Sequence, residues 1–177
     1  DRSVAVGINP PEQIRSTTCG RAIDPTHLPT RLRPKYGARG FDDLVPSQTG
    51  TLCSPKVREI VEHFEPSVHA FYPVTFEWRN GKTRDDYMFW IVQRTIKALH
   101  PDHLNPPYPG PNEFWDGYYP HLHPGGRMVF SKDAIGGAHI WADPQLTDRQ
   151  CISDELAKAF QSEGVTGFEP GNHIEER

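Results

Sequence analysis

The chain has 177 residues, enough for one domain that buries about 70% of its unfolded surface. Its longest apolar run, residues 88–92, is far shorter than the roughly 20 residues of a membrane-spanning helix, so we expect no membrane association. The formal net charge is −4, and residues 112–177 hold five Lys and Arg against eleven Asp and Glu. This balance argues against a nucleic-acid partner and permits a basic protein partner.

Cysteine and proline contents indicate the compartment and the kind of structure. Three widely spaced cysteines, Cys19, Cys53 and Cys151, suit reduced thiols in a cytosol better than a disulfide framework, so we expect a cytoplasmic protein. The chain has no basic and then apolar leader, although it starts at Asp1 without a methionine, so a processed start stays open. Eighteen prolines beside a normal hydrophobic content predict long ordered loops.

The first 40 residues show no sustained period of 2 or 3.6 and contain a proline every few residues, which predicts an extended arm wrapped over the outside. Residues 51–53 read as a short strand. Ser54 is a good N-cap, because its hydroxyl can accept a free backbone N–H, and Pro55 suits the first helical position. A single apolar stripe then predicts a helix that ends before Pro66.

Residues 71–78 alternate as a half-buried strand, with Val74, Phe76 and Trp78 on one face. Asn80-Gly81 is a strong hairpin signal, and the apolar block 87–92 offers the returning strand after a polar loop. Residues 95–99 read as a single helical turn. The proline-rich segment 101–126 is incompatible with a central strand or helix and predicts a long aromatic loop.

The last third of the sequence predicts the same order of strand, capping serine and helix as residues 51–73. Residues 127–130 and 139–141 read as short strands joined through Gly136-Gly137, and Ser153 can cap a second amphipathic helix that ends at Gly164. Residues 165–168 are expected to enter a final strand. The pattern Val-x-x-Phe-x-Pro occurs at residues 68–73 and again at 165–170, so we expect two similar helix–strand modules.

The expected fold is therefore α+β, built from two such modules with short antiparallel strands, proline-rich loops and the N-terminal arm. We expect one globular domain, residues 1–177, with the arm at 1–40, a first module at 41–100, a loop at 101–126 and a second module at 127–170. If the repeat is real, Phe71 should match Phe168 and Val57 should match Leu156 in burial. No catalytic residue recurs between the copies, which favours a scaffold role for the repeat.

Histidines supply the most metal-like pattern. His121 and His123 could share one ion as alternate strand residues, and His100 and His103 could complete a four-ligand set. A histidine-based metal-dependent hydrolase is therefore the alternative function, although loop histidines on a polar surface explain the same residues. Phosphate-binding glycine motifs and a Gly-x-Ser-x-Gly motif are absent from the sequence. We assign no catalytic residue, cofactor or metal.

Cys53 and Cys151 each precede a helix cap, where a helix dipole could stabilise a thiolate. Their apolar neighbours favour burial instead. We expect both to be small buried side chains.

Two long runs, residues 40–76 and 128–170, resemble the two halves of immunity-protein family eleven of bacterial polymorphic toxin systems. The resemblance spans about residues 41–170 and is carried by Asp42-Asp43-Leu44, Pro46, Ser54 with its helix, Phe71-Tyr72-Pro73-Val74, His139-Ile140-Trp141, Ser153-Asp154-Glu155-Leu156 and Thr166-Gly167-Phe168. It implies a non-enzymatic protein that binds and neutralises a cognate toxin domain encoded beside it. The family offers no catalytic residues to transfer.

The loop also holds the first candidate for a binding surface. Aromatic side chains are frequent anchors of protein interfaces, and an acidic rim attracts a basic nuclease-type domain. The alternative is a loop that packs on itself and covers the sheet, and the oligomeric state stays undetermined. The candidate partner-binding residues are Glu113, Phe114, Trp115, Asp116, Tyr118 and Tyr119.

Overall fold

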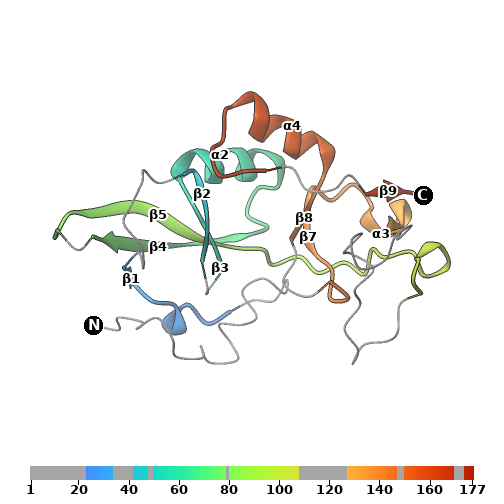
Figure 1. Ribbon diagram of the computed structural model, residues 1–177, viewed down its shortest axis with the longest axis horizontal. Coiled ribbons are helices and arrows are strands. Elements are labelled where there is room, and N and C mark those ends of the chain that lie inside the picture. The colour runs from blue at the N-terminus through green and yellow to red at the C-terminus, as the bar shows by residue number, and fades with distance from the viewer. Residues whose placement is uncertain are drawn as a thin grey trace.

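The structure is a computed structural model that describes residues 23–33, 42–47, 50–78, 80–107, 127–146, 150–169 and 174–177 (Figure 1). Helices and short strands are both present and are mixed along the chain, which confirms the α+β class. A five-stranded sheet carries two helices on one face, and a smaller part with two short sheets lies beside it (Figure 1). No helix in these residues is long and apolar enough to cross a membrane.

The five-stranded sheet has the order β1-β4-β5-β3-β2, with β1 parallel to β4 and the other neighbours antiparallel. The strands are β1 (Arg31–Leu32), β2 (Leu44–Ser47), β3 (Gly50–Cys53), β4 (Ala70–Glu77) and β5 (Thr83–Ile91). The predicted hairpin at Asn80-Gly81 joins β4 to β5, and Gly81 takes a φ of +80° in its turn. Strand β5 starts earlier than expected, because residues 83 and 84 pair with β4 instead of forming a loop.

Strand β5 is the central strand and is buried on both faces. Tyr87, Phe89 and Ile91 pack on one face of the sheet, whereas Met88 and Trp90 pack on the other. A strand with both faces covered has a continuous apolar sequence instead of an alternating one. This explains why the longest apolar run of the sequence lies here.

Helices α2 (Pro55–Phe64) and α4 (Asp154–Ser162) lie side by side on one face of the sheet (Figure 1). Both predicted apolar stripes are confirmed: Val57 and Val61 of α2, and Leu156 and Phe160 of α4, are at most 1% exposed. They pack with Met88 and other residues into one apolar cluster, the helix-side core. Each such side chain contributes about 1.5–3 kcal/mol by burial, so tertiary packing holds these short helices in place.

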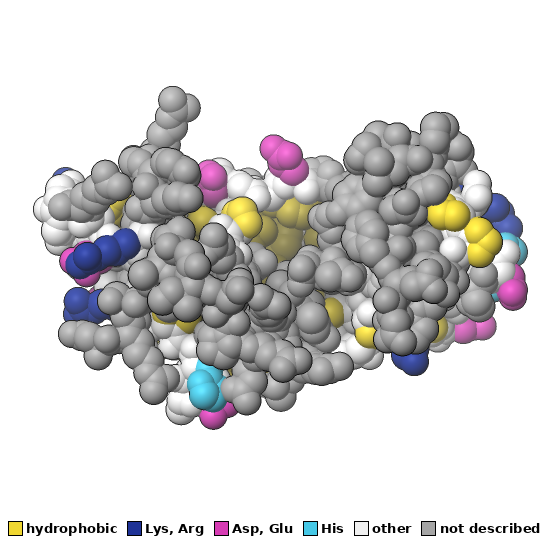
Figure 2. Space-filling model, turned by 60° about the horizontal axis from the view of Figure 1, so that its bottom comes forward, with side chains coloured by type: hydrophobic (Ala, Val, Ile, Leu, Met, Phe, Trp, Pro, Cys, Tyr) yellow, Lys and Arg dark blue, Asp and Glu magenta, His cyan; other side chains and the backbone are white. Residues whose placement is uncertain are grey.

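Residues 23–28 pack on the opposite face of the sheet, and the chain then enters its edge strand β1. They contain the 3-10 helix η2 (Pro25–His27), which begins after Asp24, whose carboxylate accepts the Thr26 N–H at 2.9 Å. Leu28 packs with Val74 and the neighbouring strand residues into a second cluster, the arm-side core. Figure 2 turns the lower side of the molecule forward and shows hydrophobic side chains in a hollow near its middle. The described part of the expected arm thus adds to the core.

The smaller part contains two two-stranded sheets. Strand β6 (Val129–Phe130) runs parallel to β9 (Glu175–Glu176), and β7 (Ile140–Ala142) runs antiparallel to β8 (Gln150–Ile152). The 3-10 helix η3 (Pro101–His103) and helix α3 (Lys132–Ile135) complete this part. A third apolar cluster contains Phe130, Ile135 and Trp141.

Residues 95–99 are extended, so the predicted helical turn is wrong. Thr95 and Leu99 form isolated bridges with Ala142 and Phe130. The Ala98 and Leu99 N–H groups donate to a carboxylate oxygen of buried Asp143 at 2.7 and 3.0 Å. Because these backbone N–H groups donate to Asp143, they do not need acceptors within the segment, as a helical turn would provide.

The predicted final strand at residues 165–168 is also wrong. Gly164 and Gly167 have φ values of +60° and +73°, which bend the chain into turns.

The connection between β6 and β7 also differs from the prediction, because it contains helix α3 in addition to Gly136-Gly137. Ser131 caps α3, and Gly136, with a φ of +57°, ends it.

The two-module repeat stays a prediction. Ser54 and Ser153 each separate a strand from a helix, and Val57 and Leu156 are both buried in the helix-side core. The Ser153 hydroxyl accepts the Leu156 N–H as predicted, at 3.2 Å, but the Ser54 hydroxyl makes no cap hydrogen bond. Residue 71 lies in β4, whereas its expected counterpart, residue 168, follows a turn.

Replacing Gly167 by alanine should destabilise the protein strongly. A Cβ at this position would lie 2.2 Å from the Leu44 carbonyl oxygen and 2.6 Å from the Asp42 Cβ, in addition to the cost of a positive φ. We expect Gly167→Ala to lower the free energy of unfolding by about 3 kcal/mol or more in urea titrations. Gly164→Ala is the matched control, because its Cβ would meet nothing within 4 Å. Equal losses in the two variants would contradict a close approach at Gly167.

Candidate functional site

The candidate partner-binding residues Glu113, Phe114, Trp115, Asp116, Tyr118 and Tyr119 lie outside the described residues. His121, His123 and Cys19 lie outside them as well. The expected binding surface therefore stays a prediction from the sequence. The described candidates are His100, His103, Cys53 and Cys151.

His100 and His103 lie at the two ends of one turn, with ring centroids 4.3 Å apart. Their proximity matches the predicted half of a ligand set. Across the described residues, no group of three or more His, Cys, Asp or Glu side chains is placed to hold a metal ion. The described part of the chain therefore supplies two neighbouring imidazoles but not a complete site.

Cys53 is buried as the sequence predicted, whereas Cys151 is half-buried. Burial raises the pKa of each thiol to about 12, and at Cys53 nearby Arg58 opposes this only partly. A thiol with such a pKa is protonated at neutral pH and is a poor nucleophile. Both residues pack as small apolar side chains, Cys53 inside the helix-side core and Cys151 at the edge of the third cluster.

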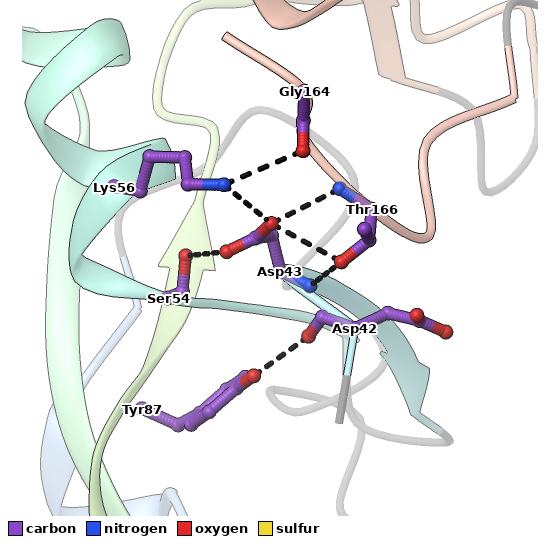
Figure 3. A network of polar contacts seen from close by, with 7 residues as sticks. All are labelled: Asp42, Asp43, Ser54, Lys56, Tyr87, Gly164 and Thr166. Atoms are coloured by element: carbon purple, nitrogen blue, oxygen red, sulfur yellow. Dashed lines mark hydrogen bonds and ion pairs between the residues drawn. The ribbon is translucent and has the colours of Figure 1, made fainter. Parts of the chain in front are cut away.

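A network around Asp43, the Asp43 cluster, joins three distant segments (Figure 3). Its carboxylate accepts the Ser54 hydroxyl at 2.7 Å on Oδ1 and the Lys56 ammonium at 3.0 Å on Oδ2. Oδ2 also accepts the backbone N–H of Thr166 at 3.0 Å and its hydroxyl at 3.1 Å. The start of β2, the start of α2 and the turn after α4 are thereby tied to one side chain.

The backbone reinforces the Asp43 cluster. The Asp43 N–H donates to the Thr166 hydroxyl at 2.9 Å, and the Leu44 N–H donates to the Thr166 carbonyl at 3.0 Å. Nearby, the Tyr87 hydroxyl donates to the Asp42 carbonyl at 2.7 Å (Figure 3). Burial alone would raise the pKa of Asp43, but hydrogen bonds from Thr166, Ser54 and Lys56 outweigh it and lower the pKa to about 2. The cluster stabilises an ionised carboxylate.

A second carboxylate, that of buried Glu65, is part of the wall of a cavity of about 540 Å³. Its Oε1 accepts the His139 N–H at 2.7 Å and pairs with Arg94, and its Oε2 accepts from His69 Nε2 at 2.5 Å. The Gln93 N–H donates to His69 Nδ1 at 3.3 Å, which assigns the proton to Nε2. We call Glu65, His69, Arg94 and His139 the Glu65 cluster.

Burial and charge differ among the members of the Glu65 cluster. Burial raises the pKa of Glu65, but the bonds from His139 and His69 and the charge of Arg94 outweigh it, so its pKa lies below the usual value. Burial lowers the pKa of His69 in spite of its bond to Glu65. The His69 side chain is 0% exposed, so it cannot reach a ligand, whereas Arg94 is 31% exposed. The accessible charge in this cavity is therefore cationic.

Sequence reasoning missed both clusters. A signal for the first was present, because Asp43 and Thr166 lie in two of the motifs that carry the family resemblance. For the second, Glu65 and His69 have the spacing of helix neighbours, but Pro66 between them ends the helix. Only the tertiary fold brings Arg94 and His139 to the same carboxylate.

Because of the Asp43 cluster, the free energy of unfolding should decrease as the pH falls into the acidic range. The pKa of Asp43 is about 2 in the folded protein against 3.8 as its ordinary value, so its contribution is complete above about pH 5 and is lost as pH falls to 2. Between pH 5.5 and pH 2, urea titrations should show the wild-type free energy of unfolding falling by about 2 kcal/mol more than that of Asp43→Asn. Asp85→Asn, at an exposed position, should keep the wild-type slope. Parallel slopes for Asp43→Asn and wild type would refute this assignment.

Glu65→Gln should be costly at neutral pH. The amide cannot accept from His69 and also from Arg94 and the His139 N–H, so a buried donor loses its acceptor. We expect a loss of about 2–4 kcal/mol in the free energy of unfolding, measured by chemical denaturation. Glu59→Gln changes an exposed residue of α2, the helix that ends just before Glu65, and should stay within about 0.5 kcal/mol of wild type. A Glu65→Gln variant as stable as that control would show that the cluster adds nothing.

Comparison with known proteins gives one result that covers nearly the whole chain. The model of the Immunity protein family (Imm11) matches residues 10–173, a longer span at both ends than the sequence resemblance to immunity-protein family eleven. The span includes both carboxylate clusters and the loop with the candidate partner-binding residues. No curated protein matches the chain. Because the family match covers far more than half of the sequence, the chain belongs to the Immunity protein family (Imm11).

Proposed function

We propose that this protein binds a cognate toxin domain of a polymorphic toxin system and neutralises it by occlusion, without catalysis. The observation that carries the proposal is the family match over residues 10–173. Proteins of this kind protect the bacterial cell that makes the toxin during interbacterial competition. We place the protein in the cytoplasm, in agreement with its unpaired Cys53, which is buried, and Cys151, which is half-buried.

The use of the buried polar groups supports binding over chemistry. The carboxylates of Asp43, Glu65 and Asp143 all accept hydrogen bonds that hold the fold. The side chain of His69 is enclosed, and both described thiols are protonated at neutral pH. These groups are committed to stability, which favours a surface that recognises a partner.

We place the interface on the aromatic and acidic loop, with Trp115, Tyr118 and Tyr119 as anchors and Glu113 and Asp116 steering a basic partner. This placement rests on sequence, since aromatic side chains dominate binding energy and rim charges mainly set association rates. Phe114 belongs to the same surface. Protection at low copy number calls for a dissociation constant near nanomolar, or roughly −12 kcal/mol.

The proposal predicts separate kinetic effects for anchors and rim charges. Against a catalytically inactive form of the toxin encoded next to this gene, Trp115→Ala should weaken binding by about 2 kcal/mol, mainly through faster dissociation. Trp115→Phe should retain most of the affinity because it keeps an aromatic ring. Glu113→Gln should mainly slow association, and the effect should shrink at high salt. Surface plasmon resonance measures both rates.

Two results would count against the proposal, in different ways. Unchanged affinity of Trp115→Ala, at unchanged thermal stability, would place the interface elsewhere. Failure of the wild-type protein to bind any toxin domain encoded beside it, or to protect cells that express that domain, would remove the function itself.

A further inference from the structure

We propose that the cavity at Glu65 and Arg94 is a specificity pocket that receives an acidic side chain, Asp or Glu, of the bound toxin domain. This inference rests on the proposed function and adds a second contact to it, distinct from the aromatic loop. The relevant features are the size of the cavity, its hydrogen-bond donors and its rigidity.

The cavity has the size and walls of a binding pocket. Its volume of about 540 Å³ lies within the roughly 300–1,000 Å³ range of ligand sites. Phe64, Val68, Ile96 and Ile135 provide apolar walls, and the backbone of Gly137 forms part of the rim. Such walls suit the short aliphatic stem of an acidic residue.

The side-chain acceptors of the cavity are already occupied. Glu65 is 4% exposed, and each of its oxygens accepts at least one hydrogen bond from the Glu65 cluster. His139 Nδ1 is engaged with the Ser153 hydroxyl at 2.8 Å, which leaves only Nε2 of that ring for a ligand. A ligand whose main groups are donors would therefore find few side-chain partners here.

Several hydrogen-bond donors of the cavity have no acceptor among the described residues. A guanidinium carries five N–H groups, and among the described residues only Nη1 of Arg94 makes a contact, to Glu65. The Gly137 N–H also has no acceptor within the described residues. A carboxylate accepts from both kinds of donor, and guanidinium binds it with two parallel hydrogen bonds. This excess of donors selects an acidic group over a basic or apolar one.

The cationic edge is held in place before binding. Glu65 fixes the position of Arg94, and His69 and His139 fix Glu65 in turn. A pre-positioned arginine loses less side-chain entropy on binding than a free surface arginine. Such a contact adds specificity, because a toxin without the acidic residue leaves the guanidinium without its second partner.

The test fills the cavity from its rim. Gly137 has a φ of +84° and room for a Cβ, and Gly81 in the β4–β5 turn has nearly the same φ, +80°, and equal room. Gly137→Gln and Gly81→Gln therefore carry a similar backbone cost, but only the first adds a side chain at the cavity. With the inactive toxin domain as the probe, Gly137→Gln should raise the dissociation constant at least tenfold, and Gly81→Gln should leave it unchanged.

A second pair of variants identifies the chemistry. Arg94→Lys keeps the positive charge beside Glu65 but loses the planar fork, and it should weaken binding about tenfold. Exposed Asp and Glu residues of the toxin are then changed one at a time to Asn and Gln. One of these changes should weaken binding as much as Arg94→Lys, and the two losses should not add in a double-mutant cycle.

The outcomes separate this inference from the proposed function. If wild type binds the toxin and Gly137→Gln binds equally well, the cavity is not part of the interface, although the immunity function stands. If Gly137→Gln weakens binding but no acidic toxin residue couples to Arg94, the pocket receives another group and the inference is wrong. Should Gly137→Gln fail to fold, the cycle with Arg94→Lys decides alone.

Discussion

The Asp43 carboxylate is the contact on which the arrangement of the larger part depends. It receives hydrogen bonds from the start of α2 and from the turn after α4, and its own backbone leads into β2. The two helices share one apolar core, so any slip between their ends would open that core to water. A single ionised side chain fixes these ends, and the close approach of Gly167 to Leu44 leaves little room for another register.

The carboxylate of Glu65 likewise joins the larger part to the smaller part through hydrogen bonds. The partners of Glu65 come from the turn after α2, the segment that follows β5 and the residue before β7. Buried ion pairs contribute little net stability compared with apolar packing, yet breaking one is expensive. Glu65 therefore specifies how the parts meet more than it adds to their stability. The same arrangement orients Arg94 at a cavity, which links the architecture to the proposed recognition of a toxin.

Sequence reasoning predicted what depends on local pattern. The stripe of α2, the hairpin at Asn80-Gly81 and the burial of Cys53 follow from periodicity, turn chemistry and composition. It was wrong where distant groups supply the hydrogen-bond partners. Asp143 draws residues 95–99 into an extended path, and the Ser54 hydroxyl donates to Asp43 and makes no cap hydrogen bond to α2. The cavity could not be predicted, since its charged residues are separated by long stretches of chain.

The separation between Asp43 and Thr166 also determines when the protein can acquire its structure. At a synthesis rate of roughly 5–20 residues per second, the segment that completes the helix-side core emerges on the order of ten seconds after α2. Until then α2 and β5 present apolar surface to solvent without α4 to cover it. A chain that is still being synthesised therefore needs time, and protection from aggregation, before its fold is complete. Under the function proposed above, a cell that begins to make the toxin and this protein together has a delay before protection starts.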